Sequence, residues 1–272
     1  MNDSLLEDGY TGQIFGKTAS AQNRIMVGIP MTGTLRAEWV IARYGQVIPC
    51  NWSQVDCIRF LEQCSPVGFL VAEARNVIAS QAVEKGFEWL FFIDHDTIIP
   101  PTTILKWNER MLKADVPVWS GLYFTKSVPS EPLIYRGRGT SYYTKWKFGD
   151  EVWCDGIPMG CSMIHVSILK ALYDESEEYE VQGHKVRRIF ETPARTWFDP
   201  EKQQWFNATG TEDLEFCTRI MQNGIFKKAG WPEYQRRKYP FLIDTSVFCK
   251  HIDPSGVQYP SRGEEQYFMP TK

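Results

Sequence analysis

Two carboxylates, Asp94 and Asp96, stand one residue apart at the end of the largely apolar run 87–93. The length and aromatic content of that run favour a buried strand of a parallel sheet. Open α/β sheets bind ligands just beyond the carboxyl ends of their strands, and side chains two residues apart on a strand point the same way. Both carboxylates could therefore reach one hard divalent cation, Mg²⁺ or Mn²⁺. The alternative is that they are ordinary turn residues, since Asp is common in turns.

Two other segments could bring chemistry to the same edge of the sheet. Residues 24–30 predict a short strand stopped by proline, and the loop 31–34 that follows would face the ligand. Arg75 stands at the start of a predicted helix over residues 72–85, on the side where the strands end, so it could reach a phosphate or a base. A solvent-exposed helix arginine explains the same residue equally well.

The elements that must position these groups alternate along the first half of the chain. Strands are expected at 24–30, 67–71, 87–93 and 116–124, and helices at 35–44, 54–63, 72–85 and 100–113. This order predicts a mostly parallel sheet covered by helices. In the second half we expect strands at 161–166 and 241–249, helices at 169–173 and 214–223, edge strands or loops over 126–150, and a solvated hairpin or lobe over 175–188.

The composition is that of a globular protein. The 272 residues are 43% hydrophobic and 23% charged, enough for one large α/β domain or two small ones. The net charge of -3 argues against a general electrostatic binder of nucleic acid. The seven cysteines are odd in number and form no CxxC pair, which favours buried free thiols. With no signal peptide and no membrane-length apolar run, the sequence predicts a soluble, cytoplasmic protein.

Taken together, these segments resemble the GT-A glycosyltransferases, especially the inverting, family-2-like type, over about residues 24–252. The resemblance is carried by a series of motifs in order along the chain. It departs from the family at two places: His95 stands in the middle of the DxD motif, and the insert at 174–207 matches nothing in the family pattern. The motifs are Ile29-Pro30 with its loop, the "RN" pair in Ala74-Arg75-Asn76, the DxD motif Asp94-His95-Asp96, a glycine-rich turn and strand at 156–164, the "ED" helix start Glu212-Asp213, and His251 after the last core strand.

The resemblance implies a GT-A fold with a central, mostly parallel sheet and a small β and loop extension on the acceptor side. It implies a catalytic domain over 24–252, with a nucleotide-sugar-binding half at 24–125 and an acceptor-binding half at 126–252. Residues 1–23 are expected to form a flexible arm or an edge extension, and residues 253–272 a C-terminal tail.

The implied activity is metal-dependent transfer of a sugar from a nucleotide diphosphate to an acceptor hydroxyl, with inversion by direct displacement. Mn²⁺ or Mg²⁺ would stabilise the leaving diphosphate, and a carboxylate at a helix start would take the hydroxyl proton. The expected residues are Asp94, Asp96 and His251 for the metal; Asp213 as base with Glu212 as its alternative or partner; Pro30, Thr32, Arg75, Asp94, His95, Asp96 and Gly121 for the donor; and Trp153, Asp155 and Gly160 for the acceptor.

Two alternatives remain beside this interpretation. The first is a sugar-phosphate nucleotidyltransferase, of whose Gly-rich basic loop the segment 31–36 is only a faint version. The second is a non-catalytic domain of the same fold that serves for binding. For the enzyme, the expected partners are a UDP- or GDP-sugar and an acceptor that is a glycan, a lipid-linked glycan, a protein or a modified nucleic-acid base.

Overall fold

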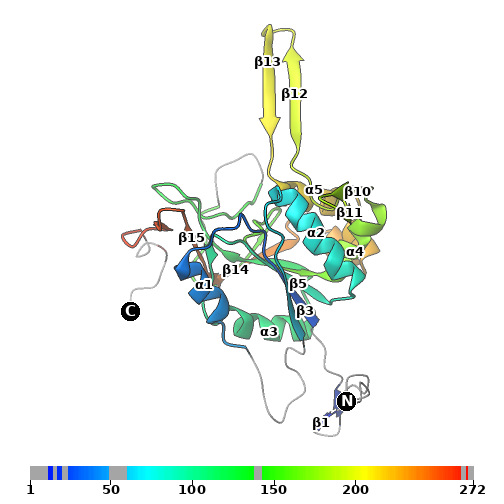
Figure 1. The fold of residues 1–272 in the computed structure, drawn as a ribbon, viewed down its shortest axis with the longest axis vertical. Coiled ribbons are helices and arrows are strands. Elements are labelled where there is room, and N and C mark those ends of the chain that lie inside the picture. The colour runs from blue at the N-terminus through cyan, green and yellow to red at the C-terminus, as the bar shows by residue number, and fades with distance from the viewer. Residues whose placement is uncertain are drawn as a thin grey trace.

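A computed structural model describes residues 12–14, 17–19, 24–48, 60–137, 143–264 and 268. Within these ranges the central sheet has seven strands in the order β4-β3-β5-β9-β7-β14-β8 (Figure 1). Strands β8 and β9 run against the other five, so the expected α/β class with a mostly parallel sheet is confirmed. The strand bounds are β3 Arg24–Gly28, β4 Phe60–Cys64, β5 Trp89–Ile93, β7 Val118–Leu122, β8 Glu151–Cys154, β9 Cys161–His165 and β14 Phe241–Phe248.

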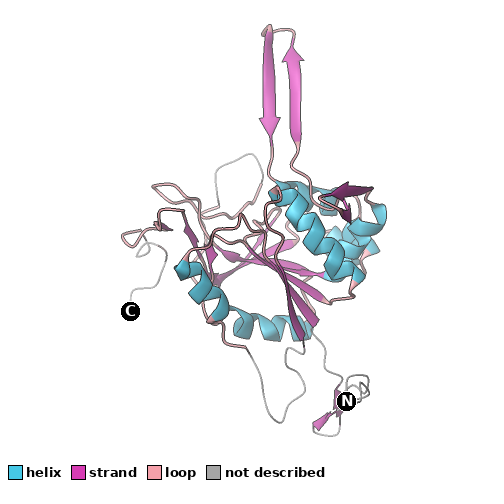
Figure 2. Ribbon diagram, in the orientation of Figure 1, coloured by secondary structure: helices cyan, strands magenta, loops and turns pink. Residues whose placement is uncertain are grey.

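Strand β5 is apolar throughout because both of its faces are covered. All five of its residues are buried, and it pairs with β3 in parallel and with β9 in antiparallel register. Helices α1 (Ala37–Tyr44) and α3 (Thr103–Lys113) pack through Trp39 and Trp107 on one face (Figure 2). Helices α2 (Val71–Glu84), α4 (Val166–Glu175) and α5 (Glu212–Gln222) pack on the other, and two short helices follow, α6 (Ile225–Lys228) and α7 (Pro232–Gln235).

The expected elements between 54 and 71 are wrong where the structure describes them. Residues 60–63, expected to be helical, lie in β4, which pairs with β3 along its whole length. Residues 67–70, expected to be a strand, are a loop with one bridge from Val67 to Met31, and Val71 already begins α2. The apolar pattern of these residues fits a helix or a strand, and pairing with β3 at the edge of the sheet decides for the strand. Residues 54–59 of the expected helix lie outside the described residues.

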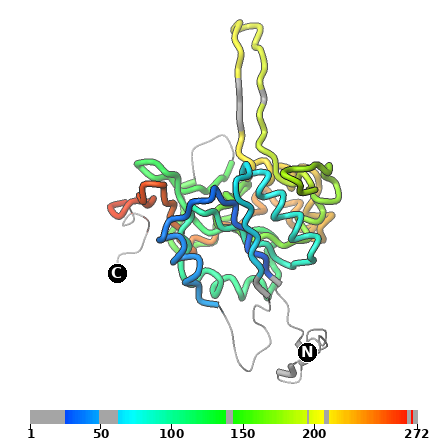
Figure 3. Tube along the Cα trace, in the orientation of Figure 1, coloured from blue at the N-terminus to red at the C-terminus, as the bar shows by residue number. Residues whose placement is uncertain are grey.

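Four smaller sheets are described beside the seven-stranded central sheet and its helices, which together form the body of the protein. Strands β6 (Thr97–Ile98), β15 (Lys250–Ile252) and β16 (Gln258–Tyr259) form one, which sets His251 opposite Thr97. The hairpin expected over 175–188 is confirmed as β10 (Glu178–Val181) and β11 (His184–Arg187). A longer hairpin, β12 (Ala194–Asp199) with β13 (Gln204–Thr209), projects from the body as an arm (Figure 3). Near the N-terminus, β1 (Gly12–Ile14) pairs with β2 (Lys17–Ala19).

Two expectations from composition can be compared with the described residues. Cys64, Cys154, Cys161, Cys217 and Cys249 are buried free thiols, as expected, whereas Cys50 and Cys57 lie outside the described ranges. No helix in the described ranges combines the length and the apolar character that crossing a bilayer needs.

Candidate active site

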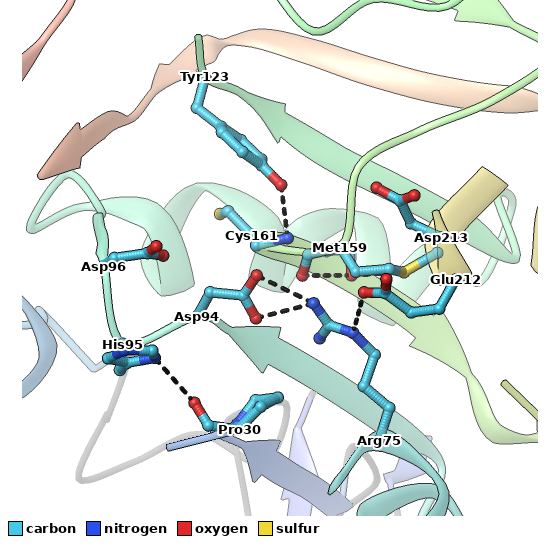
Figure 4. A network of polar contacts seen from close by, with 12 residues as sticks. Pro30, Arg75, Asp94, His95, Asp96, Tyr123, Met159, Cys161, Glu212 and Asp213 are labelled. Atoms are coloured by element: carbon cyan, nitrogen blue, oxygen red, sulfur yellow. Dashed lines mark hydrogen bonds and ion pairs between the residues drawn. The ribbon is translucent and has the colours of Figure 1, made fainter. Parts of the chain in front are cut away.

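Arg75 joins three segments that are far apart in the sequence. It lies one turn into α2 with a side chain only 2% exposed, and its Nη2 donates to both carboxylate oxygens of Asp94 at 2.9 Å. Its Nε donates to Glu212 Oε1 at 3.0 Å. The guanidinium also lies 5.0 Å from the centroid of the Phe92 ring. The sequence left open whether Arg75 is a surface residue, and the structure places it in the centre of the site (Figure 4).

His95, the unusual middle residue of the DxD motif, ties that motif to the loop after β3. Its Nδ1 lies 3.1 Å from the Pro30 carbonyl, which can only accept, so Nδ1 carries the hydrogen. Nε2 then accepts from the Thr32 hydroxyl at 3.1 Å. A cavity of about 200 Å³ opens here. It is lined by Pro30, Met31, Thr32, Phe69, Val71, Asp94, His95 and Asp96.

Asp96 and His251 face each other across the same edge of the sheet. His251 Nδ1 lies 2.5 Å from the Phe124 carbonyl and must donate to it, which leaves the lone pair on Nε2. Nε2 is 3.9 Å from Asp96 Oδ1, while Asp96 Oδ2 accepts from Lys126 Nζ at 2.5 Å. Burial lowers the pKa of His251, although the charge of Asp96 acts in the opposite direction. Burial alone would raise the pKa of Asp96, but His251, Lys126 and His95 outweigh it and lower that pKa.

Two of the three expected metal ligands fit a divalent cation. A carboxylate oxygen and an imidazole lone pair that face each other 3.9 Å apart are within twice a metal–ligand distance of about 2.1 Å. Asp94 is different, because both of its oxygens already accept from Arg75. No group of three or more His, Cys, Asp or Glu side chains within the described ranges is arranged to hold an ion. The donor set that fits is therefore Asp96 with His251, which leaves the other coordination positions to water or ligand.

The pair Glu212 and Asp213 begins α5, where the helix dipole favours negative charge. Glu212 is held by Arg75, whereas Asp213 Oδ1 accepts the Leu214 N–H at 2.8 Å and makes no ion pair with any described residue. Burial, followed by the charge of Glu212, raises the pKa of Asp213. Asp213 is thus the carboxylate of the pair that is not committed to a cation.

Tyr123 and Gly160 lie between the two carboxylate motifs. The Gly160 N–H donates to Tyr123 Oη at 2.7 Å, and the Gly160 carbonyl accepts the Asp94 N–H at 2.9 Å. A Cβ on Gly160 would stand 2.7 Å from Tyr123 Oη and 2.8 Å from Thr97 Oγ1, so no other residue fits. Burial raises the pKa of Tyr123 well above its usual value, and the nearby charges of Asp94 and Asp213 add to the shift. The phenol is therefore neutral between the two sides of the site.

Three other expected site residues, Gly121, Trp153 and Asp155, have surroundings of their own. Gly121 lies within β7, where a Cβ would be 2.9 Å from Val247 and 3.2 Å from Cys161 Sγ, so packing inside the sheet requires glycine there. Trp153 lies on β8 beneath Arg237 and lines a separate cavity of about 250 Å³. Asp155 accepts the Gly137 N–H at 3.1 and 3.2 Å and so braces a loop. Gly121, expected on the donor side, does not line the cavity beside Asp94, whereas Trp153 and Asp155, expected on the acceptor side, stay predictions.

Lys126 is the residue that sequence reasoning missed. It follows the carboxyl end of β7, and that position alone could have marked it, because such ends meet at the ligand edge of the sheet. The local composition gave no sign of this role, because Lys126 stands in a stretch of lysine, serine and proline that is typical of a surface loop.

Comparisons with known proteins address the fold. No protein-family model matches the chain. No curated protein matches it either. Among solved structures, it is similar to A197 from STIV, with a TM-score of 0.50 and 15% identity over 86% of this chain and 90% of that one. It is also similar to GalNAc-T7 crystallised with UDP, GalNAc and Mn²⁺ (TM-score 0.47, 12% identity) and to S. aureus TarS (TM-score 0.41, 13% identity).

The neighbours are glycosyltransferases of the GT-A class. This chain has a GT-A-like fold. The similarity extends over 94% of this chain for GalNAc-T7 and 83% for TarS, but it spans only 46% and 36% of those longer proteins. At 15% identity and a TM-score of 0.50, the similarity to A197 from STIV concerns the fold alone, and the chemistry has to come from this chain's own residues.

Proposed function

We propose that this protein is a metal-dependent glycosyltransferase that moves a sugar from a nucleotide diphosphate to an acceptor hydroxyl. The observation that carries the proposal is the link made by Arg75. A buried arginine holds Asp94 of the DxD motif and Glu212 of the "ED" motif at once, so two motifs 118 residues apart share one site. That site lies at the carboxyl ends of β3 and β5, where α/β sheets bind ligands.

The donor would occupy the cavity that begins at Pro30 and ends at the carboxylates. Phe69, Met31 and Val71 give it an apolar side suited to a flat base, and Thr32 and His95 give it polar groups. Asp96 and His251 would hold Mn²⁺ or Mg²⁺ at the inner end. When bound there, the metal stabilises negative charge on the leaving diphosphate.

Asp213 would act as the base. The acceptor hydroxyl gives its proton to the Asp213 carboxylate, and its oxygen forms a bond to the anomeric carbon. The bond from that carbon to the diphosphate breaks, and the electron pair leaves with the diphosphate. Burial, which raises the pKa of Asp213, also makes it a stronger base. Glu212 is neutralised by Arg75 and serves to position the start of α5.

A single displacement with a base and no enzyme nucleophile inverts the anomeric configuration. NMR of the product tests this, because retention would remove Asp213 from the role of base. Gly160, fixed between Asp94 and Tyr123, would line the acceptor side.

The direct test is a panel of UDP- and GDP-sugars with Mn²⁺, scored for release of the nucleoside diphosphate and for thermal stabilisation. We expect hydrolysis of one donor that depends on Asp96 and Asp213. Hydrolysis that survives Asp96→Ala and Asp213→Asn would refute the proposal. A parallel reaction with a sugar 1-phosphate and a nucleoside triphosphate would release diphosphate only if the protein is a nucleotidyltransferase.

A further inference from the structure

Lys126 places a positive charge on one of the two proposed metal ligands. Its Nζ is 2.5 Å from Asp96 Oδ2, and the side chains of Lys126 and Asp96 are 33% and 28% exposed. Among the described residues, the next basic side chain is His251, whose Nε2 lies 3.9 Å from Asp96 Oδ1. A lysine ammonium therefore neutralises the Asp96 carboxylate.

The loop that carries Lys126 also holds His251. The Phe124 carbonyl, two residues before Lys126, fixes the His251 ring through Nδ1. A compact turn stabilises this loop: the Thr125 N–H donates to the Glu131 carbonyl at 2.9 Å, and the Glu131 N–H donates to Thr125 Oγ1 at 3.0 Å. The lysine therefore starts from a fixed backbone, and only its flexible side chain needs to move.

A divalent cation between Asp96 and His251 would stand close to this ammonium. Like charges at such distances repel, and two cations would compete for one carboxylate. The Lys126 side chain is one-third exposed, so it can leave Asp96 toward solvent without disturbing the core. The cavity that holds the proposed diphosphate also borders Asp96, so a displaced ammonium has an anionic ligand within reach.

We propose that Lys126 is the resident counter-ion of Asp96, which a divalent metal must displace, and that the displaced ammonium then binds the diphosphate of the donor. The second half rests on the proposed function, whereas the first concerns metal binding alone. The consequence is a pair of opposite effects: Lys126 weakens binding of the bare metal and strengthens binding of the nucleotide.

The test measures both effects in Lys126→Met. Mn²⁺ binding without nucleotide is followed by the electron paramagnetic resonance signal of free Mn²⁺, and UDP and GDP binding at saturating Mn²⁺ by calorimetry. Losing a partly exposed ion pair should tighten Mn²⁺ binding about fivefold, and losing one phosphate contact should weaken binding of the preferred nucleotide about tenfold. Lys170→Met removes the same charge from an exposed pair with Asp174 on α4 and should change neither affinity.

Unchanged or weaker Mn²⁺ binding by Lys126→Met would overturn the proposal, as would the absence of Mn²⁺ binding by the unaltered protein. Tighter Mn²⁺ binding with unchanged nucleotide affinity would overturn the second half only. Lys126→Gln, which keeps a polar side chain, should reproduce the Met result, because both variants remove the charge; an effect seen only with Met would come from a disturbed loop and would overturn the proposal. Because Mn²⁺ binding needs no sugar donor, displacement of Lys126 could hold even if no nucleotide sugar were ever turned over.

Discussion

The arginine-centred site and the β12–β13 arm are neighbours in the chain but are built in opposite ways. Only Gly210 and Thr211 separate the end of β13 from Glu212. The site joins charged side chains from three distant segments around a buried arginine. The arm is held by pairing between residues 194–199 and 204–209, and it exposes aromatic side chains, with Trp205 68% exposed.

The difference concerns where the stability of each region comes from. Charges in the site are costly unless all of them are paired, so the site persists only while the whole fold holds them together. The arm is a two-stranded hairpin, which has little stability of its own. Its aromatic pairs are Trp197 with Phe206 on one face and Phe198 with Trp205 on the other. The site therefore requires the fold, whereas the fold does not require the arm.

Arg75→Met should have the largest effect, because it leaves Asp94 and Glu212 without their partner in a mostly buried site. We expect a loss of about 3–5 kcal/mol in the free energy of unfolding, measured by urea titration, together with loss of activity. The control is Arg188→Met, which breaks an exposed pair with Glu177 and should cost less than about 1 kcal/mol. Equal losses in the two variants would mean that the site contributes no more than a surface pair.

Asp213→Asn should reduce transfer by about 10²–10⁴-fold, since it removes the proposed base. It should not lower the melting temperature. Burial disfavours the charged carboxylate in the folded state, so a neutral amide of the same shape relieves a cost. Glu215→Gln, two residues further along in the first turn of α5, is the matched control and should keep full activity. A large drop in melting temperature with unchanged turnover would contradict both expectations.

The pH dependence of kcat/KM should report the same carboxylate. The folded-state pKa of Asp213 is raised above the ordinary Asp value of about 3.9, so the base becomes protonated, and activity falls, at a higher pH than for an exposed Asp. Stability changes in the opposite direction to activity. Asp213 lowers the free energy of unfolding increasingly as pH rises from its unfolded-state pKa to its higher folded-state pKa. Asp213→Asn should remove that part of the pH dependence of stability. An acidic limb at the ordinary Asp value would argue against Asp213 as base.

Deleting the arm should have the smallest effect on the body. Its two roots already meet, because the Gly210 N–H donates to the Pro193 carbonyl at 2.9 Å. Replacing residues 194–209 with a short glycine linker should leave the unfolding transition and donor hydrolysis unchanged. Transfer to a large acceptor should fall about tenfold if the exposed aromatic side chains of the arm contribute about 1.4 kcal/mol of acceptor contact. Loss of donor hydrolysis would show instead that the arm helps to position Glu212 and Asp213.

Much of the framework was predictable from local sequence. The apolar run before Asp94 predicted β5, because strands that are covered on both faces of a sheet are continuously apolar. The helices expected at 72–85 and 100–113 begin and end within three residues of α2 and α3. Strands β8 and β9, by contrast, run against their neighbours, and no local pattern gives the direction of a strand.

The chain's sequence by itself determined which segments carry acids at strand and helix ends, because these signals depend on neighbouring residues. Only the tertiary structure decided which charges meet. Arg75 lies 137 residues from Glu212, and Lys126 lies 30 residues from Asp96; in each case the sheet order, and not the spacing, sets the contact. Ion pairs act through space over a few ångströms, and folding of the whole sheet is what brings such residues within that range.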